Sequence, residues 1–340
     1  MNNAWHDGYH FLSKLTPRRA YNAARVLTSY YASRASGRPH HRGMPISLSI
    51  EPTTACNLRC PECPSGLRSF TRPTGKLSDA LFEKIIDEVQ DTLTYLLFYF
   101  QGEPFLHPQL LDWVRYASSR GIYTATSTNA HFLTDDVARR TVESGLDRLV
   151  VSIDGTTQET YQAYRVGGKL EKVLAGTKNI IRWKKALRSR TPHVVFQFLV
   201  VRPNEHQIAE VRALAKRLGV NAVGLKTAQI YDYEQGSDLM PTLPQYARYR
   251  RKSDGTYAIK NPLLNHCWKM WHSAVITWDG QVVPCCFDKD AHHVLGDVSE
   301  RSFAEIWRSA PYQRFRQTLL RSRSKIDICQ NCTEGTKVWG

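Results

Sequence analysis

Three cysteines in one short segment are the residues of this chain best suited to metal chemistry. They follow the spacing C-x3-C-x2-C in Cys56-Asn-Leu-Arg-Cys60-Pro-Glu-Cys63. Thiolates this close together can face one point and hold a soft metal or an iron–sulfur cluster. A structural zinc site would need a fourth ligand nearby, and the next histidine, His107, lies across a predicted helix and strand. Three thiolates on a four-iron cluster would leave one iron open to a substrate or cofactor.

A second group of cysteines occupies the last quarter of the sequence. Asp279-Gly280 predicts a tight hairpin turn between two short strands, and a C-x2-C pair follows further on. Four thiolates arranged in this way can close either a [4Fe-4S] cluster or a zinc site. The four candidate ligands are Cys267, Cys285, Cys329 and Cys332.

Composition places the chain among soluble globular proteins. Of its 340 residues, 42% are hydrophobic and 23% are charged, and no apolar run is long enough to span a bilayer. The N-terminus lacks the apolar core of a signal peptide, and the cysteines are grouped rather than spread, so we expect a cytoplasmic protein. The net charge of +15 predicts an acidic partner or an anionic lipid surface. No nucleic-acid-binding motif is recognisable, so no nucleic acid is expected as a partner.

The segments around the first three cysteines predict strands that alternate with helices. A strand is expected at 45–50, directly before the cysteines, and helices separate it from later strands. Six strand–helix units of this length favour a parallel sheet, and ligands of such sheets bind at the C-terminal ends of the strands. The later strands are expected at 95–100, 122–127, 148–153, 194–201 and 222–225.

The cysteine triplet after a strand, followed by alternating strands and helices, resembles the radical S-adenosylmethionine (SAM) superfamily. The resemblance implies an α/β fold, the partial (β/α)6 barrel of that superfamily, with Cys56, Cys60 and Cys63 holding a [4Fe-4S] cluster. In that family the open iron binds SAM, and reduction of the cluster yields a 5'-deoxyadenosyl radical that abstracts hydrogen from a substrate. Glu62 departs from the family pattern, which usually has an aromatic residue before the third cysteine.

The resemblance also implies a SAM site built from the ends of consecutive strands. Gln101-Gly102-Glu103-Pro104 looks like the family's GGEP motif, whose backbone contacts the methionine amino group. Arg165 is expected to pair with the SAM carboxylate, which suits the fork of a guanidinium. Polar contacts are expected from Ser127 and Asn129, ribose contacts from Ser152 and Asp154, and the lining of the adenine pocket from Leu199 and Val201.

The second cysteine group resembles the SPASM/Twitch extension of radical SAM enzymes. The order C…Asp-Gly-x-Val-x-Pro-Cys…Leu-Gly-x-Val…Glu-Ile-Trp…C-x2-C carries this resemblance. It implies a small C-terminal iron–sulfur extension with one auxiliary [4Fe-4S] cluster on the four cysteines named above, because a second cluster would need more cysteines. Cys286 remains. It could replace Cys285 as a ligand, pack in the interior, or donate a hydrogen atom to a substrate radical, as a thiol does in radical SAM epimerases.

The segment before the first strand predicts a basic amphipathic helix. Thr16-Pro17 reads as its start, and an apolar stripe is expected from Ala20, Ala23, Ala24, Leu27, Tyr30 and Tyr31. Such a helix either packs on its own domain or lies on an anionic membrane as a peripheral contact. The expected domains are an N-terminal helical segment at 1–44, the barrel at 45–228, and a linker plus auxiliary-cluster domain at 229–340.

Two functions from different classes follow. The first is a radical SAM oxidoreductase or maturase-type enzyme that performs oxidation, epimerisation or crosslinking. Its electron donor would be a flavodoxin or ferredoxin, and its substrate a small molecule, a sugar, a lipid-linked compound or a peptide. The second is a non-catalytic, cysteine-rich metal-binding adaptor for membrane or nucleic acid. The polar residues at the strand ends have no purpose in the adaptor, so we expect the enzyme.

Overall fold

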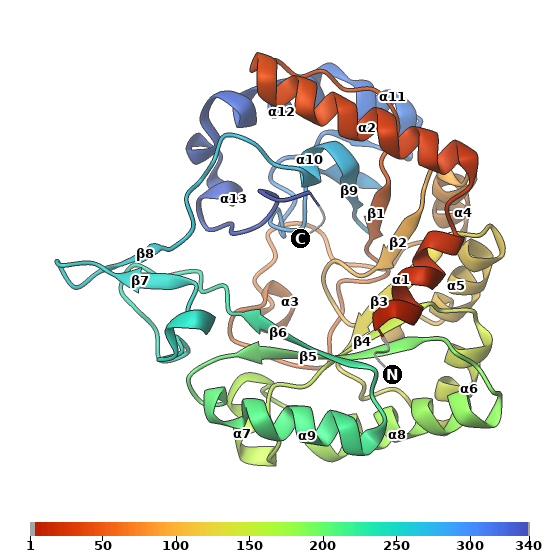
Figure 1. Ribbon diagram of the computed structural model, residues 1–340, viewed down its shortest axis with the longest axis vertical. Coiled ribbons are helices and arrows are strands. Elements are labelled where there is room, and N and C mark those ends of the chain that lie inside the picture. Colours follow the sequence, from red (N-terminus) through yellow and green to blue (C-terminus); the bar gives the residue numbers. More distant parts are fainter. Residues whose placement is uncertain (1–3, 339–340) are drawn as a thin grey trace.

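A curved sheet of nine strands organises the computed structural model, which describes residues 4–338 (Figure 1). The strands lie side by side in the order β11-β10-β9-β1-β2-β3-β4-β5-β6, and each neighbouring pair from β1 to β6 is parallel. The six parallel strands are β1 (Ser47–Ile50), β2 (Tyr95–Phe98), β3 (Tyr123–Thr128), β4 (Arg148–Ser152), β5 (His193–Val200) and β6 (Ala222–Thr227). The prediction of a parallel α/β partial barrel is therefore confirmed.

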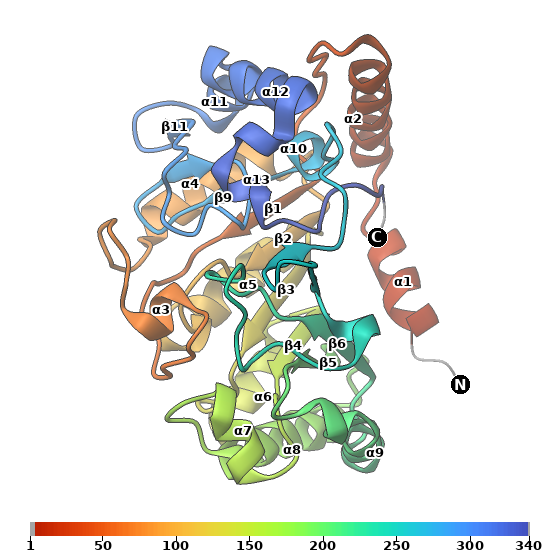
Figure 2. The same cartoon turned by 90° about the vertical axis from the view of Figure 1, so that its left-hand side faces the viewer.

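Helices cover the outer, convex side of this sheet (Figures 1 and 2). They are α4 (Asp79–Val89), α5 (Leu110–Ser119), α6 (Asp135–Glu143), α7 (Gln158–Tyr164), α8 (Leu170–Ala186) and α9 (Ile208–Leu218). Local sequence sets where they begin. Ser78 accepts a hydrogen bond from the backbone N–H of Leu81, which makes it the N-cap of α4 as its residue type predicts.

The strand β2 differs from its expected burial. A continuous apolar run predicts a strand that is buried on both faces. Instead Leu96 and Phe98 are fully buried against the helices, whereas Tyr95 and Leu97 on the inner face are only partly buried. The inner face of a partial barrel is less tightly filled than that of a closed one, and this leaves room for a site.

The C-terminal part extends the same sheet. The strand β9 (Ser273–Ile276) pairs in parallel with β1, and β10 (Gln281–Val283) returns antiparallel to β9. Gly280 has a φ of +94° in the turn between them, a conformation that glycine adopts without strain. The remaining elements are β11 (Gly296–Asp297), α10 (Lys269–His272), α11 (Phe303–Arg308), α12 (Ala310–Ser322) and α13 (Asp327–Gln330).

The helix α2 (Pro17–Ser36) begins where the sequence predicts, since the side chain of Thr16 caps it by accepting from the N–H of Arg19. The expected apolar stripe is wrong in part, because Ala20, Ala24 and Tyr31 are exposed. The buried face of α2 instead consists of Arg19, Asn22, Val26, Ser29, Tyr30 and Ser33. The preceding helix α1 (Ala4–Ser13) and the hairpin of β7 (Tyr249–Arg251) with β8 (Tyr257–Ile259) are not foreseen by the sequence analysis.

Candidate active site

The three cysteines of the triplet line one pocket at the C-terminal ends of the parallel strands. Arg165, which ends α7, lines the same pocket. So do five more of the predicted site residues, which are Gly102, Glu103, Ser127, Asn129 and Ser152. Two further lining residues, Tyr99 and Thr128, were missed by the sequence analysis. Tyr99 lies within an apolar run of the sequence, so only its position directly after β2 could have identified it as a site residue.

The cysteine loop is held by close backbone packing. The short helix α3 (Pro64–Leu67) follows Cys63 directly. A Cβ added to Gly66 would lie 2.5 Å from the backbone nitrogen of Cys60, so only glycine lets α3 approach the loop this closely. Glu62, the residue that departs from the family pattern, accepts a hydrogen bond of 2.9 Å from the N–H of Tyr231 and so ties the loop to the segment after β6.

Cys60 is buried in this loop and Cys56 and Cys63 are half-buried, and the surroundings of Cys56 and Cys60 shift the pKa values of their thiols. Burial raises the pKa of Cys56 to about 11 and also raises the pKa of Cys60. Arg165 opposes this effect at Cys60, because its Nη1 donates to Sγ over 3.7 Å. A coordinating metal deprotonates a thiol outright, so the chemistry of these three donors, which line one pocket, fits a metal cluster.

Gly102 allows the segment that follows β2 to lie against the start of the cysteine loop. Its φ is +76°, and a Cβ there would lie 2.2 Å from the carbonyl oxygen of Thr53. Its N–H donates to the hydroxyl of Ser65 over 2.9 Å. The glycine of the expected motif is thus required by the fold, while the neighbouring position tolerates Gln101, whose Oε1 lies 4.0 Å from Sγ of Cys63.

Glu103 is a buried acid that joins the ends of two strands. Its Oε1 accepts from the hydroxyl of Thr128 and its Oε2 from the N–H of Asn129, both over 2.7 Å. Burial raises the pKa of this carboxyl to about 7. The carboxylate therefore positions the end of β3, which carries Ser127 and leads to Asn129, and Asn129 in turn donates to Asn57 over 2.7 Å. Pro104 is buried at the start of a single 3-10 turn and does not line the pocket.

Asp154 lies behind Arg165 rather than in the pocket. Its Oδ2 accepts from Nε of Arg165 over 2.5 Å and its Oδ1 from the N–H of Leu199 over 2.7 Å, so both oxygens have protein partners. Leu199 and Val201 belong to a separate hydrophobic cluster that contacts the cysteine loop, and neither lines the pocket. The structure thus brings most of the predicted site residues into one pocket, but Asp154, Leu199 and Val201 lie outside it.

The C-terminal cysteines form a second group in the structure. Cys267, Cys329 and Cys332 are buried, and Cys285, which is half-buried, interacts electrostatically with Cys267 and Cys332. Arg323 donates from Nη2 to Sγ of Cys332 over 3.2 Å, which compensates developing thiolate charge. Gly335 has a φ of +78°, and a Cβ there would lie 2.2 Å from Sγ of Cys267.

Cys286 differs from these four, because it is exposed and its Sγ lies 3.8 Å from Nζ of Lys269. Over residues 4–338, no three histidine, cysteine, aspartate or glutamate side chains converge on a position for a single metal ion.

Comparison with known sequence families matches both halves of the chain. Residues 50–215 match the radical SAM superfamily, and residues 267–333 match SPASM, an iron–sulfur cluster-binding domain. The chain belongs to the radical SAM superfamily. It carries a C-terminal SPASM domain, and the two matches together span more than half of its length.

Curated relatives and solved structures agree with this membership. The tungsten-containing aldehyde ferredoxin oxidoreductase cofactor-modifying protein of Pyrococcus furiosus is 29% identical over 302 residues, which are 79% of this chain and 82% of the relative. The PqqA peptide cyclase of Gluconobacter oxydans is 24% identical over 322 residues, covering 87% and 85%. The structure of Streptococcus suis SuiB bound to S-adenosylmethionine superposes with a TM-score of 0.64 at 13% identity, covering 85% of this chain and 71% of SuiB.

The protein is therefore a radical SAM enzyme, which uses SAM and a [4Fe-4S] cluster, and its SPASM domain indicates auxiliary iron–sulfur chemistry. The non-catalytic adaptor is set aside. Among the helices within residues 4–338, none combines the length and the apolar character that crossing a bilayer requires.

Proposed function

We propose that this enzyme cleaves SAM reductively at a [4Fe-4S] cluster held by Cys56, Cys60 and Cys63, and abstracts hydrogen from a C–H bond of its substrate. The observation that carries the proposal is the shared pocket, which brings these thiols together with Arg165 and the polar ends of β3 and β4. When bound to these three cysteines, the cluster would supply the electron for the reductive cleavage of SAM. The residues around it bind and orient the cofactor.

Arg165 is the proposed partner of the SAM carboxylate. Asp154 holds its Nε, so the guanidinium enters the pocket already oriented, with Nη1 beside Cys60. Pre-orientation lowers the entropy lost when the carboxylate binds. Asp154 thus contributes by positioning Arg165 rather than by touching the ribose. The backbone of Gly102 is the proposed partner of the methionine amino group, and the polar side chains proposed for the rest of SAM are Ser127, Asn129 and Ser152.

One auxiliary [4Fe-4S] cluster is proposed on Cys267, Cys285, Cys329 and Cys332. Outside the triplet the chain has five cysteines, which is enough for one fully ligated cluster but not for two. Cys285 is the proposed ligand of the Cys-Cys pair, because its side chain is half-buried whereas that of Cys286 is exposed. A role for Cys286 as a hydrogen-atom donor stays a prediction.

Among the four expected substrate classes we favour a peptide. The support is the PqqA peptide cyclase, whose similarity to this chain covers 87% of it and so includes both the barrel and the SPASM domain. An acidic flavodoxin or ferredoxin remains the proposed electron donor for a protein of net charge +15. Peripheral membrane contact through the exposed basic face of α2 also stays a prediction, as does a cytoplasmic location.

The test is anaerobic reconstitution with iron and sulfide, followed by iron counting and an assay of 5'-deoxyadenosine with dithionite and SAM. We expect about eight irons per chain and formation of 5'-deoxyadenosine. Zinc in place of iron, with no SAM cleavage, would contradict the proposal. About four irons with the product still formed would contradict only the auxiliary cluster.

The substrate class needs a separate readout. A deuterated peptide library should transfer deuterium to 5'-deoxyadenosine, detected by mass spectrometry, because the radical takes its hydrogen from the substrate. Transfer from deuterated sugars or lipid-linked compounds, with none from peptides, would contradict the peptide proposal and leave SAM cleavage intact.

A further inference from the structure

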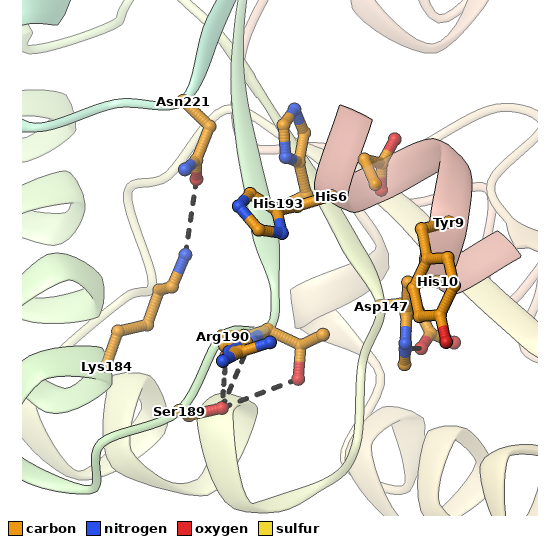
Figure 3. Close-up of a pocket in the computed structure, with 11 residues that line it drawn as sticks. His6, Tyr9, His10, Asp147, Lys184, Ser189, Arg190, His193 and Asn221 are labelled. Carbon is orange, nitrogen blue, oxygen red and sulfur yellow. Dashed lines mark hydrogen bonds and ion pairs between the residues drawn. The ribbon is translucent and has the colours of Figure 1, made fainter. Parts of the chain in front are cut away.

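A cavity of about 450 Å³ lies at the base of the barrel, away from the cysteines (Figure 3). It is enclosed by α1, by the end of α8 with the loop after it, and by the residues that precede or begin β4, β5 and β6. This volume is in the range of small-molecule sites. Three histidines, a lysine and an arginine are among the lining residues: His6, His10, Lys184, Arg190 and His193.

The cavity and the cysteine pocket lie at opposite ends of the same strands. Asp147, just before β4, lines the cavity, whereas Ser152, the last residue of β4, lines the cysteine pocket. Five residues of strand separate them by about 17 Å. The proposed SAM chemistry therefore does not use this cavity, and its polar residues need another explanation.

The acidic side chains of the cavity are already paired with protein groups. Asp147 accepts from Nε2 of His10 over 2.5 Å and from the N–H of Thr124 over 2.7 Å. Asp7 pairs with Arg148 and also accepts from the hydroxyl of Tyr123. These partners neutralise the negative charge of the lining, so the cationic side chains determine what the cavity attracts.

Lys184 faces the cavity with neutral partners only. Its ammonium donates to the carbonyl oxygen of Pro192 over 2.5 Å and to Oδ1 of Asn221 over 3.2 Å, which leaves one of its three donors without a protein acceptor among the described residues. Burial without a counter-ion lowers the pKa of Lys184 to about 8. Arg190 adds a second cation and has no carboxylate partner within residues 4–338.

His193 adds a third polar group to the cavity. The residue is only 8% exposed, and its imidazole makes no hydrogen bond to another residue that the structure describes. Its ring nitrogens are not among the buried side-chain atoms that lack a partner, so they reach the open space of the cavity and can bond to what occupies it. In Figure 3, His193 and His6 lie on one side of the space that Lys184, Asn221 and Arg190 also surround.

We propose that this cavity binds a small phosphate-bearing anion. Lys184 and Arg190 would meet the phosphate, since an ammonium and a guanidinium are the strongest side-chain partners of phosphate oxygens. His193 would donate its ring N–H to another oxygen of the same ligand. A bound anion would link α1 to the base of the barrel, because His6 and His10 on α1 line the same cavity. Inorganic phosphate and a phosphate ester share this chemistry, and the test separates them.

The test is isothermal titration of the full-length, cluster-loaded protein, anaerobically and with EDTA present. The probes are inorganic phosphate, pyrophosphate and ribose 5-phosphate, with sodium chloride at matched ionic strength as the blank. We expect saturable binding that is at least tenfold weaker in Lys184→Met and in Arg190→Gln. Tighter binding of ribose 5-phosphate than of inorganic phosphate would identify an ester as the ligand.

Lys185→Met is the matched control, because Lys185 is the exposed neighbour of Lys184 on the same helix and does not line the cavity. It should bind the probes as the unaltered protein does. Iron content and melting temperature without ligand report whether each variant folds, and Arg190 is exposed, so its variant should fold. No saturable binding to any probe, or equal weakening in all three variants, would overturn the proposal.

Discussion

Glu103 shows how one buried carboxylate positions a whole wall of the pocket. Replacing it with glutamine keeps the shape but turns one acceptor into a donor, which then faces the fixed N–H of Asn129 or the hydroxyl of Thr128. Leaving such a buried group without a partner costs about 1–3 kcal/mol. Glu103→Gln should therefore lower the urea midpoint of the cluster-loaded protein and weaken SAM binding. Glu143→Gln, at an exposed surface ion pair, should change neither quantity, and equal behaviour of the two variants would refute this role for Glu103.

Arg165 provides a second test at the residue scale. Lysine keeps the charge but loses both the Nε donation to Asp154 and the fork that suits a carboxylate. In Arg165→Lys we expect the dissociation constant for SAM to rise about tenfold, which corresponds to about 1.4 kcal/mol. Titration calorimetry under anaerobic conditions measures this constant. Arg182→Lys, at an exposed pair with Asp135, is the control, and an unchanged constant in Arg165→Lys would exclude pairing with the SAM carboxylate.

At the scale of elements, the buried Arg19 fixes α2 to the base of the barrel. Its guanidinium donates to the carbonyl oxygens of Lys14, Gln90, Arg120 and Gly121, and the middle two are the residues that cap the ends of α4 and α5. Arg19→Met leaves these carbonyls without their donor, so we expect a loss of about 3 kcal/mol in the free energy of unfolding.

The control for Arg19 is its neighbour Arg18, whose ion pair with Asp91 is exposed. Exposed pairs contribute less than about 1 kcal/mol, so Arg18→Met should unfold at nearly the same urea concentration as the unaltered protein. If the two variants lose equal stability, the four carbonyl contacts of Arg19 do not hold α2 in place.

The same contacts explain which elements the sequence could predict. The alternation of the barrel strands and helices is set by local pattern and capping, as at Ser78, so it could be read directly. The buried face of α2 could not, because its polar residues bond to distant segments, as when Asn22 donates to the carbonyl oxygen of Met44. α1 contains Gly8, a weak helix former, and tertiary pairs such as His10 with Asp147 hold it.

The candidate site also contains some features that the sequence could predict and others that it could not. Spacing and the preceding strand singled out the three cysteines that the structure brings to one pocket, and Gly102 was expected from its motif and proves to be needed for close backbone approach. The placement of Asp154 behind Arg165 could not be predicted, because a carboxylate at a strand end can face either a ligand or a neighbouring side chain. Only the position of α7 relative to β4 decides between these two orientations.

At the scale of the whole molecule, the SPASM domain and the barrel share one sheet. β9 pairs with β1 along its full length, and Asp290 accepts from the N–H of Thr71 in the segment after the cysteine loop. Large apolar side chains supply most of the packing that supports this junction, since Trp271, Phe303 and Trp307 are fully buried in the main core, at whose edge Cys267 and Cys329 also pack.

Removal of one proposed auxiliary ligand should therefore leave the barrel folded. In Cys329→Ala we expect about four of about eight irons to be lost, while SAM is still cleaved to 5'-deoxyadenosine. Cys285→Ala should lose iron in the same way, and Cys286→Ala should retain it, because Cys286 is the one exposed cysteine of the five outside the triplet and Cys285 is half-buried. Iron counting after anaerobic reconstitution decides the matter. Loss of iron in Cys286→Ala but not in Cys285→Ala would show that Cys286, rather than Cys285, is the ligand. Loss of all iron in Cys329→Ala would show instead that the two cluster sites form one cooperative unit through the pairing of β1 with β9.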